Sequence, residues 1–287
     1  MEPGIYELSN HDYHAGPGLS CSSFKEFLRS PAHYQHYLTE KRVPTPAMVV
    51  GTAIHTAILE PDKFQDEVVV EPEFAPKKPS KTQREAKKPS PETVEAIKFW
   101  DDFQAKATGK TVISHDDYEN VMGMLTGAMR CEPAVNLLKT GFPELSVYAN
   151  DPEHGFLWKA RPDWLTPAGA VVDVKKCQDA SPKAFQRQIV NYRYHIQAAL
   201  YLQVLTWATG KKHELFYFLA VEEKPPHCAA VYQIDFRSVS YASLEIDKGR
   251  KRFAECLKTG QWPGYSNKIL PTGIPEWAAT SDGNFED

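Results

Sequence analysis

The pattern of apolar and polar positions predicts helices over most of the first 140 residues. Apolar residues recur at helical spacing after the serines at 20–23, which are candidate N-caps, and a Ser-Pro pair at 30–31 ends this helix. A second short helix follows. At 46–59 only three polar side chains, among them His55, interrupt the apolar run, which predicts a largely buried helix. Further helical patterns cover 92–107 and 115–138.

Beyond Pro143 the pattern changes to that of strands. The runs LSVYAN, FLWKARPDWL and AVVDVKKC are rich in β-branched and aromatic residues and are separated by turn residues, which predicts a three-stranded antiparallel meander. A helix then follows Ser181-Pro182. The remaining elements are expected to be a helix at about 194–208, the strands HELFYFLAVEE and CAAVYQIDF, and a helix at about 239–258.

This order of elements predicts an α/β protein with one central mixed sheet flanked by helices, plus a helical N-terminal part that packs onto it. We expect a single domain over residues 1–270 and a peripheral C-terminal tail over 271–287. Residues 72–93 contain five prolines, five lysines and one arginine with no apolar period, which predicts a mobile loop. The lysines of this loop could add nonspecific affinity that falls steeply with salt, or the loop could be a simple tether.

Composition argues against several classes of protein. The 287 residues are 42% hydrophobic, ample for a packed core, yet no window approaches the roughly 18 uninterrupted apolar residues of a membrane-spanning helix. The N-terminus lacks the basic and apolar regions of a secretion signal, so we expect a cytoplasmic protein with no membrane partner. The five dispersed cysteines argue against a disulfide scaffold or structural zinc site. With a net charge of -4, any nucleic-acid binding must use local basic patches.

The most informative stretch contains two aspartates on neighbouring predicted strands. Asp163 follows Arg161-Pro162, and Asp173-Val174-Lys175 begins ten positions later. The alternation of a strand directs Asp173 and Lys175 to one face and Val174 to the core. Converging carboxylates attract a hard divalent cation, and a nearby lysine can orient a metal-activated water and offset charge on a phosphate under attack.

Each of these features has a structural alternative. A hairpin with two solvated aspartates, one of them paired with Lys175, fits these residues about equally well. Gln197 and Tyr201 lie four residues apart and share a helix face, where they could serve the carboxylates or form an ordinary polar stripe. A neutral His55 could complete a metal site beside Gly51, whose small size would let the helix approach closely, but a lone histidine on an apolar helix is more often a core residue.

Together, these motifs resemble a known series. The RecB-like branch of the PD-(D/E)XK nuclease superfamily has motifs that match, in order, Gly51-Thr52-Ala53-Ile54-His55, Glu144, Arg161-Pro162-Asp163, Asp173-Val174-Lys175 and Gln197-x-x-x-Tyr201. More closely, the chain resembles the nuclease domain of the exodeoxyribonuclease VIII (RecE-type) family. The stretches that carry this resemblance, which runs to about residue 265, are MEPGIYELSNHDYHAGPGLS, SPAHYQHYL, GTAIHTAILEPDKF and YRYHIQAALY.

The resemblance implies a magnesium-dependent, ATP-independent exonuclease that degrades linear double-stranded DNA from 5′ to 3′ and leaves a 3′ single-stranded tail. It also implies a ring-like homo-oligomer and a RecT-type single-strand annealing protein as partner. Carboxylate, carbonyl and water ligands suit Mg²⁺ and Mn²⁺ alike, so the choice between these ions stays open.

The resemblance also implies roles for individual residues. His55, Asp163, Asp173 and the carbonyl of Val174 become metal ligands, and Lys175 becomes the residue that orients water and stabilises charge. Gln197 and Tyr201 become active-site support, and Glu144 a carboxylate near the metal. The implied DNA contacts are Ser22, Ser23, Arg29, Arg161, Lys176 and Tyr194.

Two departures and two rival functions remain. The loop at 72–93 has no counterpart in the family pattern, and LPTGIPEWA resembles the family's final motif with an interruption. One rival function is a structure-specific endonuclease of the same superfamily, which closed circular DNA would distinguish. The other is a non-catalytic DNA-binding protein, against which the complete set of Asp163, Asp173 and Lys175 argues.

Overall fold

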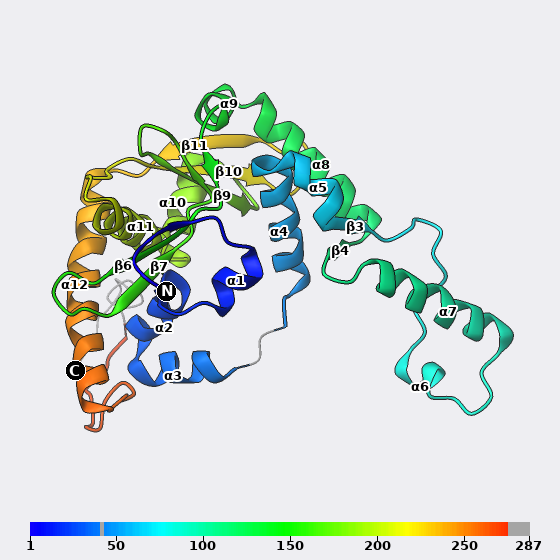
Figure 1. Ribbon diagram of the computed structural model, residues 1–287, viewed down its shortest axis with the longest axis horizontal. Coiled ribbons are helices and arrows are strands. Elements are labelled where there is room, and N and C mark those ends of the chain that lie inside the picture. Colours follow the sequence, from blue (N-terminus) through cyan, green and yellow to red (C-terminus); the bar gives the residue numbers. More distant parts are fainter. Residues whose placement is uncertain (41–42, 275–287) are drawn as a thin grey trace, which may run out of the picture.

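The structure is a computed structural model that describes residues 1–40 and 43–274. Its N-terminal part contains short strands and helices in alternation, followed by the buried helix predicted at 46–59 (Figure 1). The elements are β1 (Gly4–Tyr6), α1 (Asn10–Ala15), β2 (Leu19–Ser20), α2 (Cys21–Arg29), α3 (Pro31–Thr39) and α4 (Pro46–Leu59). Ser20 caps α2 through a capping box with Ser23, and the predicted end at Ser30-Pro31 is confirmed.

The middle of the chain forms an arm and two further helices before the main strands begin. The elements are α5 (Pro61–Glu67), β3 (Val68–Val70), α6 (Lys81–Arg84), α7 (Pro91–Lys106), β4 (Thr111–Ile113), α8 (His115–Arg130) and α9 (Glu132–Leu138). The single helix predicted over 115–138 is therefore wrong. It breaks at Cys131, and Pro133 stands in the first turn of α9, where its missing N–H costs nothing.

The remaining elements build most of the sheets. They are β5 (Phe142–Pro143), β6 (Ser146–Asn150), β7 (Leu157–Ala160), β8 (Trp164–Leu165), β9 (Val171–Cys177), α10 (Pro182–Asn191), α11 (Tyr194–Thr209), β10 (Phe216–Glu222), β11 (Ala229–Gln233) and α12 (Phe236–Thr259). A five-stranded mixed sheet has the order β11-β10-β9-β8-β5, and a four-stranded sheet has the order β1-β6-β7-β2. The predicted α/β class with mixed sheets and flanking helices is confirmed.

The predicted meander is wrong in one informative respect. The run FLWKARPDWL is not one strand, because it breaks at 161–163 into β7 and β8. β7 pairs with β6 in the four-stranded sheet, whereas β8 pairs with β9 in the five-stranded sheet. Pro162 has no N–H to donate to a ladder, which favours a break at this point. Asp163 therefore lies where the chain leaves one sheet for the other.

Two apolar clusters cover the two faces of the five-stranded sheet. Helix α11 packs on one face, between the sheet and β6–β7, whereas α4 and α8 pack on the other. Val172 and Val174 face the α4–α8 side, while Val171 and Cys177 face the α11 side. This confirms the alternation predicted for β9, with Val174 in the core.

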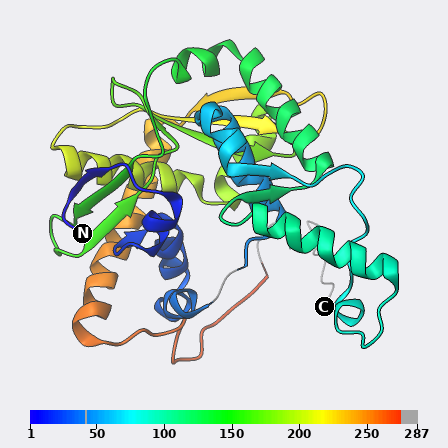
Figure 2. The same ribbon diagram turned by 45° about the vertical axis from the view of Figure 1, so that its right-hand side comes forward.

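Residues 68–113 project from the body as an arm, visible in Figures 1 and 2. The parallel pair β3–β4 forms its base, and α7 is its longest element. The range 72–93, predicted as a loop, contains α6 and the start of α7 and contacts α7 through the indole N–H of Trp100, which donates to the carbonyl of Pro76 at 2.8 Å. Its predicted mobility stays a prediction.

The chain ends outside the sheets. Residues 271–274 have no regular secondary structure, and the rest of the predicted tail lies outside the described residues. Within the described part of the chain, no helix is long and apolar enough to cross a membrane.

Candidate active site

Asp163 lies at the break between β7 and β8 and is buried. Trp164 pairs with Val172 across β8 and β9, so Asp163, one residue earlier, lies beside Asp173. One oxygen of the Asp163 carboxylate accepts a hydrogen bond of 2.7 Å from the backbone N–H of Val174. The two aspartates predicted on neighbouring strands are thus brought together at the end of a strand and are not solvated hairpin residues.

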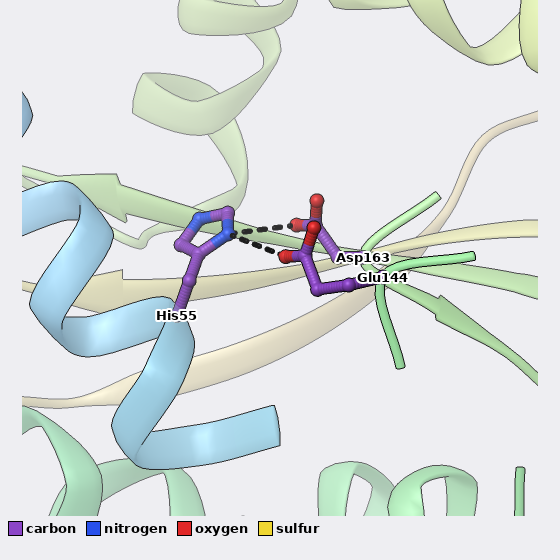
Figure 3. A group of neighbouring side chains, drawn as sticks. All are labelled: His55, Glu144 and Asp163. Atoms are coloured by element: carbon purple, nitrogen blue, oxygen red, sulfur yellow. Dashed lines mark ion pairs between the residues drawn. The ribbon is translucent and has the colours of Figure 1, made fainter. Parts of the chain in front are cut away.

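His55 reaches the same point from α4, as Figure 3 shows. Its Nδ1 lies 3.4 Å from a carboxylate oxygen of Asp163 and 3.9 Å from one of Glu144, and its Nε2 lies 3.0 Å from the carbonyl of Val174. Ligand atoms of His55, Glu144 and Asp163 lie within 4.8 Å of one another. His55 is therefore not an isolated core histidine.

The charges in this cluster shift one another's ionisation. Burial, followed by the neighbouring Asp173 carboxylate, raises the pKa of Asp163, and His55 opposes this; the net value is about 7. Desolvation alone would lower the pKa of His55, but the carboxylates of Asp163 and Glu144 outweigh it and raise the value to about 9. His55 and Arg161 hold the pKa of Glu144 below its usual value despite burial. An imidazolium at His55 thus balances part of the negative charge.

Asp173 and Lys175 form an ion pair on the opposite face of β9 from Val174. Asp173 is fully buried, and its second carboxylate oxygen accepts a 2.7 Å hydrogen bond from the side-chain amide of Gln197. The ammonium of Lys175 lies 4.6 Å from the centre of the Tyr194 ring. Desolvation would lower the pKa of Lys175, but Asp173 and Asp163 raise it well above its usual range.

The donor set fits a hard divalent cation. Asp163 and Glu144 offer oxygen atoms and His55 offers a nitrogen, and these ligand atoms lie close together. The carbonyl of Val174 offers a further oxygen, but it faces the other ring nitrogen of His55, Nε2. Burying several carboxylates together is unfavourable unless a positive charge compensates them. Asp173 differs in that its oxygens contact Lys175 and Gln197 in this structure.

A cleft of about 720 Å³ opens onto this cluster. His55, Glu144 and Asp163 line it, together with Tyr201 of α11 and Gly51 of α4. A Cβ atom added to Gly51 would meet nothing within 4 Å. The prediction that Gly51 lets α4 pack closely against a neighbour is therefore wrong. Gly51 instead borders the cleft, where the lack of a side chain leaves space.

Comparison with known proteins agrees with this geometry. The PDDEXK-like domain of unknown function (DUF3799) matches residues 20–270. The chain belongs to this family. Its fold is similar to the crystal structure of a "putative exonuclease" from Eubacterium rectale, with a TM-score of 0.60, 14% sequence identity and coverage of 96% of this chain and 99% of that one. At this identity the likeness shows the fold alone, which is that of the PD-(D/E)XK nuclease superfamily.

Two further comparisons add little. The crystal structure of SSO0001 is 10% identical over 79% of this chain and 84% of its own, but a TM-score of 0.23 supports no inference. No curated protein matches the chain.

The two serines predicted to contact DNA, at the start of α2, differ in their exposure. Ser22 is exposed and lines the cleft, whereas Ser23 is buried and its hydroxyl donates to the carbonyl of Ser20 within the capping box. Arg29 lies exposed at the other end of α2, where its Nε donates to the hydroxyl of Tyr265 at 3.3 Å. Of these three side chains, only Ser22 borders the cleft.

The other predicted DNA contacts also have protein partners. Arg161 lines the cleft, but its guanidinium donates to Glu144 at 2.6 Å and to the hydroxyl of Ser146 at 2.6 Å, so it holds Glu144 in place. Lys176 forms an ion pair of 2.9 Å with Glu223. Its position after Lys175 on β9 directs it to the other face of the strand.

Lys25 was missed by the sequence analysis. It extends from α2, donates to the carbonyl of Tyr192 at 3.0 Å, and lies 5.7 Å from the centre of the same Tyr194 ring that Lys175 contacts. Two ammonium groups therefore lie near the same Tyr194 ring. The sequence gives no signal that a lysine on an amphipathic helix contacts Tyr194, because this contact depends on how α2 packs against α11.

Proposed function

We propose that this protein is a magnesium-dependent, ATP-independent exodeoxyribonuclease that degrades linear double-stranded DNA from 5′ to 3′. The observation that carries the proposal is the convergence of Asp163 with Asp173, Val174 and Lys175 at the strand break, beside a cleft. A hairpin of solvated aspartates would not bury both carboxylates. A non-catalytic binding module would have no need to bury two carboxylates beside a lysine.

His55, Asp163 and Glu144, whose ligand atoms lie close together, would hold the metal. The resemblance adds Asp173 and the carbonyl of Val174 as ligands; in this structure Asp173 contacts Lys175 and Gln197, and the carbonyl faces Nε2 of His55. A bound Mg²⁺ or Mn²⁺ lowers the pKa of water and stabilises charge on the phosphate and the leaving oxygen. Glu144 is kept in place by Arg161, which donates to it at 2.6 Å, so the carboxylate enters the site already oriented.

Lys175 supplies a positive charge beside Asp173. Its ammonium is held between the carboxylate of Asp173 and the ring of Tyr194. These two contacts keep the ammonium desolvated and beside the carboxylates of the site. From there it can orient the attacking water and offset charge that develops on the phosphate. Gln197 positions Asp173 through its amide, and Tyr201 lines the cleft from the same helix.

The finer details of the proposal rest on the resemblance to the exodeoxyribonuclease VIII family. They are entry at a DNA end, 5′ to 3′ polarity, a 3′ single-stranded product, a ring-like homo-oligomer and a RecT-type annealing partner in the cytoplasm of a bacterial or phage-infected cell. The structural neighbour from Eubacterium rectale, itself described as a "putative exonuclease", is consistent with the first of these.

The test uses linear duplex DNA labelled at the 5′ end of one strand, a matched duplex labelled at the 3′ end, and closed circular plasmid. Each is incubated with the protein in Mg²⁺, in Mn²⁺ and in chelator. We expect metal-dependent release of the 5′ label at early times, late release of the 3′ label, and an intact circle.

Other outcomes would select other functions. Nicking of the circle would indicate the structure-specific endonuclease with the same site. Early release of the 3′ label would reverse the polarity, and failure to cut any substrate while binding DNA would indicate the non-catalytic alternative.

A further inference from the structure

The arm concentrates positive charge in a chain that is negative overall. Residues 77–88 contain five lysines, one arginine and one glutamate, a net charge of +5 against -4 for the whole chain. All six basic side chains are exposed. The arm holds this segment away from the body, as both views show (Figures 1 and 2).

Three of these six cations have an acidic partner nearby. Arg84 pairs with Asp101 of α7 at 2.8 Å, Lys78 pairs with Glu71 and Lys81 lies near Glu85. By contrast, Lys77, Lys87 and Lys88 form no ion pair with any residue in the ranges 1–40 and 43–274.

The engaged residues hold the segment against α7. Trp100 donates to the carbonyl of Pro76, and the ammonium of Lys78 lies 4.8 Å from the centre of the Trp100 ring. Arg84 reaches the neighbouring Asp101. These contacts anchor the basic segment to α7, a helix of 16 residues that is about 24 Å long.

An exposed aromatic side chain stands in the same segment. Phe74 is 92% exposed, although burying such a side chain is worth about 2 kcal/mol. Lys77 is three residues away, within about 11 Å even in extended chain. Exposed aromatic rings interleaved with cations are typical of surfaces that bind single-stranded nucleic acid, where bases stack on the ring and phosphates follow the charge.

Residues at the base of the arm line the cleft of the candidate active site. Gly109 and Thr111, which lead into and begin β4, line the same cleft as His55 and Asp163. A strand that leaves the candidate active site along this wall would reach the arm without crossing the body of the protein.

We propose that the arm is a binding site for single-stranded DNA, in which Lys77, Lys87 and Lys88 contact phosphates and Phe74 stacks on a base. This rests on the proposed function, because hydrolysis of one strand of a duplex leaves the other as a single-stranded tail. The arm would hold that tail while the duplex advances into the cleft.

The test measures binding of the full chain, in chelator to prevent hydrolysis, to a fluorescein-labelled oligo(dT) of about 30 nucleotides and to a blunt duplex of equal length. One variant is Phe74→Ala. A second replaces Lys77, Lys87 and Lys88 with Gln. Its control replaces Lys248, Lys251 and Lys258 with Gln, an equal loss of charge on exposed positions of α12, at the other side of the molecule (Figure 1).

We expect Phe74→Ala to weaken binding to oligo(dT) about tenfold, the effect of losing one base–aromatic stack, and to leave duplex binding unchanged. In the arm triple variant, the slope of log Kd against log salt concentration for oligo(dT) should fall by about 2, whereas the α12 control should keep the wild-type slope.

An unchanged slope in the arm variant, an equal fall in the α12 control, or a loss confined to the duplex would each overturn the proposal. Wild-type protein that degrades linear DNA but does not bind oligo(dT) would overturn the role of the arm and leave the proposed function standing. Protein that neither cuts nor binds DNA would overturn both.

Discussion

The carboxylate of Asp163 accepts its 2.7 Å hydrogen bond from the backbone N–H of Val174, and the carbonyl of that same Val174 lies 3.0 Å from the imidazole of His55. One residue of β9 thus fixes a side chain from the strand break and another from α4, 108 positions apart in the chain. The candidate site is preorganised by backbone groups, which a side-chain substitution at Asp163 or Asp173 leaves in place.

Replacing Asp173 with Ala should lower the cleavage rate by on the order of a thousandfold or more, which abolishes cleavage for practical purposes. The variant loses a proposed metal ligand and the ion-pair partner of Lys175. Since Asp173→Ala leaves the buried ammonium of Lys175 without an acceptor, Asp173→Asn serves as its match: its amide oxygen can accept from Lys175 in place of the carboxylate. Both variants should retain weak DNA binding. Rates on linear duplex, with circular dichroism to verify folding, check this. Full activity in folded Asp173→Ala would refute the site assignment.

Lys175→Ala should lower turnover about a hundredfold or more while metal affinity stays close to that of the wild type, since the lysine acts on water and phosphate and not on the metal. Calorimetric titration with Mn²⁺ measures the affinity, and single-turnover cleavage measures the rate. Lys176→Ala is the matched control, because Lys176 lies on the other face of β9 and pairs with Glu223. If Lys175→Ala lost all metal binding, its assigned role would be wrong.

Much of the local structure follows from periodicity alone. The period of two in Val172, Asp173, Val174 and Lys175 predicted which side chains share a face, and the structure confirms it. The capping serines and Ser30-Pro31 likewise set the limits of α2, because these signals act within a few residues.

The break of the helix predicted over 115–138 is a local error, whereas the other errors concern how segments meet. The break at Pro162 sends β7 and β8 to different sheets, and an apolar run reads the same whether it forms one strand or two. The prediction of close packing at Gly51 is wrong because sequence spacing does not show whether a helix face packs against another element or borders a cleft. The spacing left open whether His55 joins the metal site or is a core residue, since a contact over 108 positions has no period.

The hairpin β6–β7 is tied to α12 by a buried ion pair, which gives a prediction on stability. Asp151 is 2% exposed and accepts from Arg250 at 2.6 and 2.9 Å and from the indole of Trp158 at 3.0 Å. Asp151→Asn should lower the free energy of unfolding by about 3 kcal/mol, because Arg250 loses its buried partner. Asp247→Asn, which removes the exposed partner of Arg250, should cost less than about 1 kcal/mol. Urea denaturation compares the two; equal losses would contradict the assignment.

The same pair gives a pH dependence. Burial alone would raise the pKa of Asp151, but hydrogen bonds from Arg250, Trp158 and His154 lower it to about 2. The folded state then binds this proton more weakly than the unfolded chain, whose value is 3.8. Its contribution of about 2 kcal/mol is present above pH 4 and is lost as the pH falls from 3.8 towards 2. The stability difference between wild type and Asp151→Asn should therefore narrow at pH 3. A difference that stayed constant from pH 7 to pH 3 would show that folding does not lower the pKa of Asp151, and would contradict the predicted effect of Arg250.

Two helical glycines provide a matched comparison of packing. A Cβ atom at Gly127 of α8 would lie 1.9 Å from the backbone carbonyl oxygen of His227, whereas one at Gly51 of α4 would meet nothing within 4 Å. Both substitutions to Ala gain the same helix propensity, about 1 kcal/mol, so the difference between them isolates the clash. Gly51→Ala should be as stable as the wild type or more so, and Gly127→Ala should be less stable by about 1–3 kcal/mol, since a backbone atom cannot rotate away. Chemical denaturation of both variants measures this. Equal stability of the two would show that the loop carrying His227 does not pack against α8 as described.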